Sequence, residues 1–141
     1  MKEFSFRCYG HTNITALHKS TLEFTTESDL TQKGDCIVGV KASTNLKSLP
    51  KNIQTLIRKN DTKIKVILKV NEFSDEIQGR GHPDLNLSDE NAIIIRTSNY
   101  ICPRTLMINA NKAAKDILME IRNLMKDSKT VMDVTLQLES G

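Results

Sequence analysis

The stretch from Arg7 to Thr15, RCYGHTNIT, recurs in altered form as QGRGHPDLN at residues 78–86. An offset of 71 residues aligns the two Gly-His pairs with each other. Beyond residue 40, an offset of 68 aligns seven identical pairs: Ala42, Lys47, Ile53, Leu56, Thr62, Val66 and Leu68 with Ala110, Lys115, Ile121, Leu124, Thr130, Val134 and Leu136. Self-similarity at a nearly constant spacing indicates repeated units. We therefore interpret the chain as one domain, residues 1–141, made of two copies of one unit, residues 1–71 and 72–141.

The change of offset from 71 to 68 predicts three extra residues in the first copy. The segment TTESDLTQKGD, residues 25–35, has loop composition and lies where the offset changes. Alternating apolar residues and short apolar runs predict the strands around it. These strands are expected near residues 4–8, 22–24, 37–42 and 66–70, with counterparts near 77, 93–95, 106–108 and 131–138.

Each copy is predicted to contain one helix near its end. In the first copy, Pro50 suits the first turn of a helix, which is expected to run to residue 59. In the second copy, an apolar stripe predicts a helix over residues 112–126. Helical spacing places four equivalent residues in the core: Ile53, Leu56, Ile121 and Leu124.

Units of about 70 residues are too small to bury a large core alone, so the two copies are expected to share one. The sequence predicts an α+β domain that is mainly antiparallel β, sandwich-like or barrel-like, with two helices related by a pseudo-twofold axis. The junction from Val70 to Phe73 is predicted to be a tight hairpin turn, although it lacks the Gly of an Asn-Gly pair.

The composition is that of an ordinary folded protein. Of 141 residues, 38% are hydrophobic and 26% are charged, and 20 Lys and Arg against 17 Asp and Glu give a net charge of +3. This charge allows RNA or a small anionic ligand as partner, but it is far from that of a dedicated duplex-DNA binder. No secretory or membrane-spanning pattern is present, which predicts a cytoplasmic protein with no membrane partner. The sequence leaves the oligomeric state open.

Four segments point to a known family: GHTNITALHKSTLEFT (residues 10–25), GDCIVGVKA (34–42), IIIRTSNYICPRTL (93–106) and NKAAKD (111–116). In this order they resemble a family of small, mainly archaeal proteins catalogued as domain of unknown function 371. The resemblance covers nearly the whole chain and implies a mainly β, sandwich-type fold, but no activity. The sequence departs from the family pattern at Thr12 and Glu72, where Pro and Gly are expected. Both are turn positions, so the fold is not in doubt.

The polar cluster of residues 10–23 is not required by the repeat. At the offset of 71, its charged residues align with residues of another character: His18, Lys19 and Glu23 with Asp89, Glu90 and Ile94. We expect the first three to lie near Asp35 and Cys36, with His11 and Asn13 lining the edge of the site. The catalytic candidates are His18, Asp35 and Cys36. The matched pairs Gly10-His11 and Gly81-His82 are interpreted as architectural, with Gly at a bend or a positive-φ turn.

Three cysteines, Cys8, Cys36 and Cys102, are too few and too widely spaced for a disulfide framework, so thiols are expected. Cys8 and His11 have a spacing that zinc could use, with His18 and the other cysteines as further ligands. However, no Cys-x-x-Cys pair is present, and buried thiols explain the same residues. We predict no metal and no cofactor. A Cys36 or Cys102 nucleophile with a histidine base is the enzymatic alternative to buried thiols.

Anion binding is the chemistry that the remaining residues favour. Arg96 and Arg104 precede Lys112, which stands at the expected helix start, where free N–H groups favour a phosphate or carboxylate. Lys19 would add a charge from the first copy, and a solvated basic face is the alternative interpretation. We predict a binding module for an anionic, phosphorylated partner such as RNA or a phosphometabolite. The alternative is a small enzyme that acts on an anionic substrate with His18 as acid or base.

Overall fold

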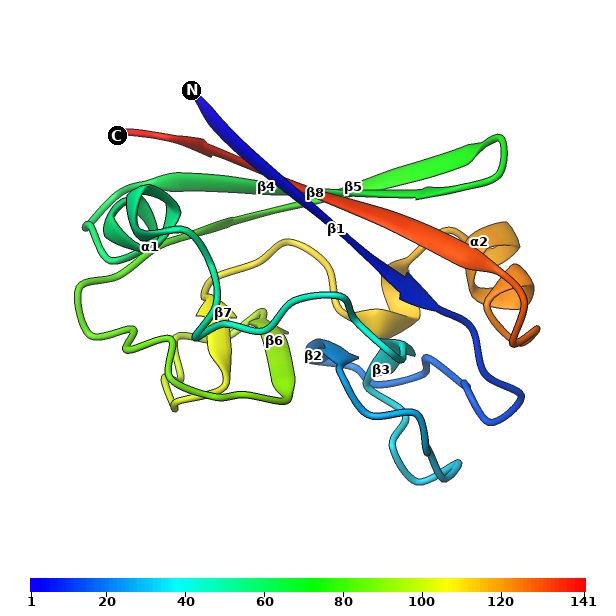
Figure 1. Ribbon diagram of the computed structural model, residues 1–141. Helices are drawn as coiled ribbons and strands as arrows, with labels where there is room; N and C mark the ends of the chain where they lie inside the picture. The colour runs from blue at the N-terminus through cyan, green and yellow to red at the C-terminus, as the bar shows by residue number, and fades with distance from the viewer.

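Eight strands form two four-stranded sheets that pack face to face in the computed structural model of residues 1–141 (Figure 1). The first sheet is antiparallel and has the order β1 (Lys2–Tyr9), β8 (Val131–Glu139), β4 (Lys63–Val70) and β5 (Phe73–Arg80). The second has the order β3 (Ile37–Gly39), β2 (Thr21–Thr25), β6 (Ala92–Arg96) and β7 (Thr105–Met107). Its central pair is antiparallel and its outer pairs are parallel. The helices are α1 (Lys51–Ile57), the 3₁₀ helix η1 (Ala114–Asp116) and α2 (Met119–Leu124). The predicted α+β, mainly antiparallel fold is confirmed.

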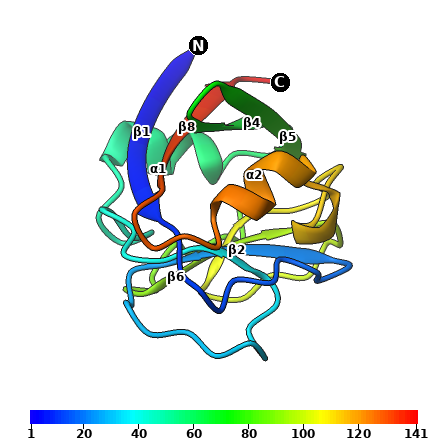
Figure 2. The same cartoon turned by 90° about the vertical axis from the view of Figure 1, so that its right-hand side faces the viewer.

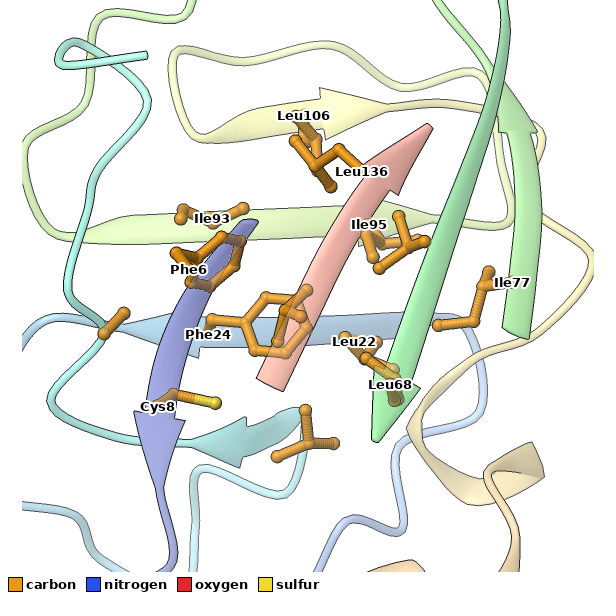
Figure 3. Packing of buried hydrophobic residues seen from close by; sticks show 14 of the residues in the cluster. Phe6, Cys8, Leu22, Phe24, Leu68, Ile77, Ile93, Ile95, Leu106 and Leu136 are labelled. Atoms are coloured by element: carbon orange, nitrogen blue, oxygen red, sulfur yellow. The ribbon is translucent and has the colours of Figure 1, made fainter. Parts of the chain in front are cut away.

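The core lies between the sheets, whose strands cross at a large angle (Figure 3). Because side chains alternate along a strand, each sheet presents one apolar face to the other. Phe6 of β1 and Phe24 of β2 meet edge to face, with ring centroids 5.5 Å apart. The core around them is aliphatic and includes Leu22, Leu68, Ile77, Ile93, Ile95, Leu106 and Leu136. α1 and α2 lie at opposite ends of the sandwich, and the two chain ends lie close together (Figures 1 and 2).

The strand order of each sheet is symmetric. If β1, β2, β3 and β4 are exchanged with β5, β6, β7 and β8, each sheet keeps its strand order in the reverse direction. Isolated backbone pairs outside the strands match in the same way, since Tyr9 pairs with Val40 and Arg80 pairs with Ile108. These correspondences follow the offsets of 71 and 68. They support the predicted duplication, which stays a prediction about the origin of the chain.

Two predicted turns lie where the sequence indicates. Eleven residues separate β2 from β3, whereas eight separate β6 from β7, so the three extra residues of the first half lie within residues 26–36. At the junction of β4 and β5, Val70 pairs directly with Phe73, which confirms the hairpin. Asn71 adopts a φ of 54° there, a left-handed conformation that Asn tolerates better than most residues.

The second helix differs from the prediction of one helix over residues 112–126. Ile117 and Leu118 are extended, with ψ of 143° and 128°, and separate η1 from α2. At this break, the Leu118 N–H donates to Asp75 Oδ2 on β5 at 2.9 Å, and the Ile117 carbonyl accepts from Arg122 Nε at 2.8 Å. These two bonds, one to a distant strand and one within the segment, satisfy backbone groups that an unbroken helix would otherwise pair internally. The apolar stripe in the sequence does not reveal them.

The inner faces of the helices also differ from the prediction. Ile53 and Ile121 are buried as expected. Leu56 and Leu124 are only partly buried against the core, because the next residue of each segment points inward instead. The residues that take their place are Ile57 and Met125.

Each Gly-His pair contacts the end of the helix in the other half of the chain. The N–H groups of Gly10 and His11 donate to the carbonyls of Thr130 and Met125, and those of Gly81 and His82 to Thr62 and Ile57. Neither glycine has a positive φ, contrary to the turn suggested by the sequence. A Cβ at either position would instead overlap carbonyl oxygens at the helix end. Close approach of two backbones is therefore what requires glycine here.

We expect Gly10→Ala and Gly81→Ala each to lower the free energy of unfolding by roughly 1–3 kcal/mol, because the new methyl group would meet fixed backbone atoms. Gly34→Ala is the control, since its closest neighbours are the ends of the Leu30 and Ile37 side chains, which can move. Urea denaturation of the three variants measures the difference. An equal loss at Gly34 would contradict the importance of the helix-end contact.

Candidate functional site

Some of the predicted site residues gather on the outer face of the second sheet. Leu22 and Phe24 of β2 point into the core, so Glu23 between them points outward. The Cys36 thiol donates to Glu23 Oε1 at 3.5 Å, and Arg104 lies close enough to act electrostatically on this carboxyl group. Residues from both halves therefore meet here, although the surface is not hollowed at this point.

Burial dominates the chemistry of the Glu23–Cys36 pair. It raises the pKa of Glu23 above its ordinary value, despite the opposing effects of Cys36 and Arg104. Burial, together with the neighbouring Glu23 carboxylate, raises the pKa of Cys36 to about 12. At neutral pH, Cys36 is therefore a thiol that donates to Glu23. This arrangement disfavours Cys36 as a nucleophile, since the thiolate is the reactive form.

His18 is held as a hydrogen-bond acceptor in a turn. Its Nδ1 atom accepts the backbone N–H groups of Ser20 and Thr21 at 3.2 and 3.1 Å. At the equivalent place in the second half, Asp89 Oδ2 accepts the N–H groups of the residues two and three positions later, at 3.0 and 2.6 Å. An imidazole nitrogen in one half and a carboxylate oxygen in the other thus accept the same two backbone N–H groups of equivalent turns. This contact favours a structural role for His18.

Two predicted anion-binding lysines differ in their surroundings. Lys19 is exposed and forms no ion pair. Lys112 pairs with Asp75 on β5. Partial burial raises the pKa of Asp75, but hydrogen bonds from Lys112 and from the backbone N–H groups of Leu118 and Glu76 outweigh it and hold this pKa below its ordinary value. The charge of Lys112 is therefore balanced within the fold.

The remaining lining residues also make local contacts. Asn13 Nδ2 donates to the Leu30 carbonyl at 2.7 Å, and His11 Nδ1 accepts the Asn13 N–H at 2.9 Å. The Asp35 carbonyl accepts the His18 N–H at 3.2 Å. These bonds order the loops around β2 and β3.

A second group of polar residues surrounds Cys102. Arg96 of β6 directs one N–H at Cys102 Sγ, 3.3 Å away, and its Nε–H at Thr105 Oγ1, 2.9 Å away. Thr105 Oγ1 also accepts the Cys102 N–H at 3.1 Å. Because two N–H groups point at this oxygen, the Thr105 hydroxyl proton is directed at the Cys102 sulfur, 3.7 Å away. The Arg96 guanidinium also lies over the Tyr100 ring, 4.8 Å from its centroid.

These donors set Cys102 apart from the other two cysteines. Partial burial raises its pKa, but hydrogen bonds from the Arg104 backbone N–H, the Thr105 hydroxyl and the Arg96 guanidinium outweigh this and hold the pKa below its ordinary value. By contrast, burial raises the pKa of Cys8 to about 12. Cys102 is also partly exposed. It is therefore the thiol of this chain that is best placed to react.

The sequence prediction did not include the basic residues of α1 and β4. Residues 47–69, here called the basic segment, contain seven Lys or Arg and one acidic residue, Asp61. Residues 1–71 contain twelve basic and six acidic residues, and residues 72–141 contain eight and eleven. The basic segment could therefore have been found from the sequence, as a difference in charge between the two halves. A net charge of +3 conceals it, because the two halves partly cancel.

Both hollows of the surface are lined by this basic segment. The helix hollow, about 470 Å³ in volume, is lined by Lys51, Gln54, Thr55, Arg58, Lys59 and Pro83. The sheet-end hollow, about 390 Å³, lies over the ends of β4, β5 and β8. Its polar lining includes Lys63, Lys65, Gln78, Arg80, Gln137 and Glu139.

All three cysteines are free thiols. Cys8 is buried in the core, whereas Cys36 and Cys102 belong to the two separate clusters described above. No group of three or more His, Cys, Asp or Glu side chains is arranged so as to hold a metal ion. None of the helices combines the length and apolar character needed to cross a membrane.

A family model described as a domain of unknown function, DUF371, matches residues 6–139. The chain belongs to the DUF371 family. It is similar to an uncharacterised protein from the archaeon Methanocaldococcus jannaschii, with 45% identity over 130 residues that cover 92% of this chain and 96% of the relative. The match confirms the resemblance carried by the four quoted segments. The DUF371 region includes both the Cys102 cluster and the basic segment.

The turn at His18 yields a test of its role. We expect His18→Asp to keep the free energy of unfolding nearly unchanged, because Asp89 accepts the corresponding N–H groups in the other half. His18→Ala should cost about 1 kcal/mol, the typical loss when a side chain that accepts such N–H groups is removed. Thermal and urea denaturation at neutral pH compare the two. Equal destabilisation by both substitutions would contradict the acceptor role.

Proposed function

We propose that the protein is a binding module for an anionic, phosphorylated partner, which it contacts through the basic segment on α1 and β4. The observation that carries this proposal is that cations of this one segment line both hollows. Lysine and arginine supply the charge and the hydrogen-bond donors that phosphate groups require.

The cations in α1 and directly after it have no structural partner. Lys51, Arg58 and Lys59 are exposed, and none lies within 4.0 Å of a carboxylate. α1 itself contains no acidic residue, whereas α2 contains Glu120. An exposed lysine that forms an ion pair already has a partner within the fold. Unpaired cations that share a hollow instead favour an external anion.

The lining of the hollows also indicates how a nucleic acid would be contacted. No aromatic side chain lines either hollow, so bases would find no stacking platform there. Contacts would be made to phosphates, which position a nucleic acid without specifying its sequence. Binding to RNA through this surface would therefore depend strongly on salt and little on sequence.

A second candidate function, an enzyme acting on an anionic substrate, is favoured by the Cys102 cluster. We infer that Cys102 is its nucleophile and that His18 is not its acid or base, because His18 Nδ1 is occupied by two backbone N–H groups. Arg96 would stabilise the Cys102 thiolate. Arg104, two residues after Cys102, is exposed and adds positive charge. A cation beside a cysteine is one of the features that lower a thiol pKa and create a nucleophile.

We expect single-stranded poly-U RNA to bind at low salt, and the triple variant Lys51→Ala, Arg58→Ala, Lys59→Ala to bind it at least about tenfold more weakly. Each lost phosphate contact should also reduce the slope of log affinity against log salt by about 0.7. Fluorescence anisotropy at several salt concentrations measures both. Lys126→Ala, at the position equivalent to Arg58 beside α2, is the matched control and should have little effect. Equal binding by the triple variant would place RNA contacts elsewhere.

The thiols are expected to differ in their reaction with iodoacetamide. At pH 7, a thiol with a pKa of about 12, such as Cys8 or Cys36, is ionised in about one molecule in 10⁵, whereas the lowered pKa of Cys102 gives a much larger thiolate fraction. Mass spectrometry should therefore find Cys102 modified first. Arg96→Ala should raise the pH at which Cys102 reacts, because a stabilising cation is lost. An unchanged pH profile in Arg96→Ala would contradict this role.

A further inference from the structure

The sheet-end hollow is built from two rows of side chains that cross the first sheet. In one row, Arg80 of β5, Lys63 of β4 and Glu139 of β8 face one another in register. In the next row on the same face, Gln78, Lys65 and Gln137 occupy the same three strands. Side chains directly opposite on neighbouring strands lie close together and share a face. The two rows therefore bring three cations, two amides and one carboxylate together on a rigid sheet.

The cations of this hollow are poorly neutralised. Lys63 and Arg80 are direct cross-strand partners, an arrangement that is unfavourable for like charges, and the single carboxylate of the row, Glu139, faces Lys63 from the other strand. Neither lies within 4.0 Å of a carboxylate. Lys65 lies 3.7 Å from Glu76, and the side chains of this pair are about 39% and 51% exposed. A bound anion would relieve the repulsion between Lys63 and Arg80.

The equivalent place in the other half of the chain shows what the fold requires there. At the offsets of 71 and 68, Tyr9 and Val131 replace Arg80 and Lys63, and they face each other in register. In the next row, Arg7 and Asp133 form an ion pair at 3.0 Å. No hollow is present at that place. The sheet therefore forms with a Tyr–Val pair and an ion pair at the equivalent place. The cations of the sheet-end hollow are not needed to form the sheet.

The remaining lining favours a ligand that carries hydroxyl groups besides its anionic group. Gln137 Nε2 donates to Glu3 Oε1 at 2.7 Å, which orients the amide and leaves its oxygen as an acceptor. Gln78 and Asn109 add amide groups, and Glu139 adds a carboxylate acceptor. Only two of the ten lining residues are hydrophobic, which disfavours an apolar ligand. A volume of about 390 Å³ is within the range of small-molecule sites.

We propose that the sheet-end hollow binds a small phosphorylated polyhydroxy compound, such as a sugar phosphate. Lys63 and Arg80 contact the phosphate, and Gln78, Gln137 and Glu139 bind the hydroxyl groups. The inference rests on the proposed anion-binding function and identifies the class of ligand for one of its two hollows.

Isothermal titration calorimetry with ribose 5-phosphate, inorganic phosphate and ribose tests this assignment on the full chain. We expect ribose 5-phosphate to bind more tightly than inorganic phosphate, and ribose not to bind. The double variant Lys63→Ala, Arg80→Ala should weaken ribose 5-phosphate binding at least about tenfold, because two charge-assisted contacts are lost. The double variant Lys126→Ala, Lys129→Ala is the matched control, since both are exposed lysines that lie outside the basic segment and line neither hollow. Thermal denaturation verifies that both variants are folded.

Glu139→Gln separates recognition of hydroxyl groups from recognition of charge. Removal of this negative charge should strengthen binding of inorganic phosphate and should reduce the preference for ribose 5-phosphate over phosphate. Amide chemical shifts of the wild-type chain give an independent measurement, because ribose 5-phosphate should perturb the ends of β4, β5 and β8. Perturbations centred on α1 would overturn the assignment to this hollow.

The outcomes distinguish this inference from the proposed function. Poly-U binding that depends on α1, without ribose 5-phosphate binding, would overturn the inference and leave the proposed function intact. Binding of ribose 5-phosphate that is equal in the wild type and the double variant would also overturn the inference. Absence of binding by every anion at low salt would overturn both.

Discussion

Close contact between a glycine and the end of a helix from the other half of the chain determines how this protein is assembled. Gly10 lies against carbonyl oxygens at the end of α2, and Gly81 lies against those at the end of α1. The central strand pairs, β4 with β8 and β2 with β6, also join one half to the other. Neither half can therefore complete its sheets or cover its helix alone. The outer face of the first sheet is left as a mainly polar surface, because its strands alternate buried apolar residues with more exposed, mostly polar ones.

Comparison of the two halves separates structural from functional roles only when the contacts are known. His18 and Asp89 differ in residue type, yet both accept two backbone N–H groups in the same turn. Arg96 and Cys102 also differ from their counterparts, Thr25 and Gly34, but here no comparable cluster exists in the other half. A difference in sequence between equivalent positions is therefore informative only where the contacts differ as well.

Charge is unevenly distributed over this fold in a way that the net charge conceals. Basic residues are concentrated on α1 and β4, whereas the second half carries an excess of acidic residues. Some of these charges are balanced internally, as in the pair of Lys112 with Asp75. Others, such as Lys63 opposite Arg80, are not. The unbalanced cations line the hollows, and for this reason the proposed binding surface differs from the residues that sequence reasoning favoured.

The sequence by itself determined the features that depend on local pattern. Alternation of apolar residues identified the strands, Pro50 marked the start of α1, and loop composition located the three extra residues after β2. Only the tertiary structure decided the break at Ile117 and Leu118, because Asp75 lies 43 positions from the N–H that it accepts. The same holds for the Cys102 sulfur, whose donors act through the positions that the second sheet imposes on Arg96 and Thr105. Periodicity reports the preference of each segment, whereas a pKa or an ion pair depends on which side chains the folded chain brings together.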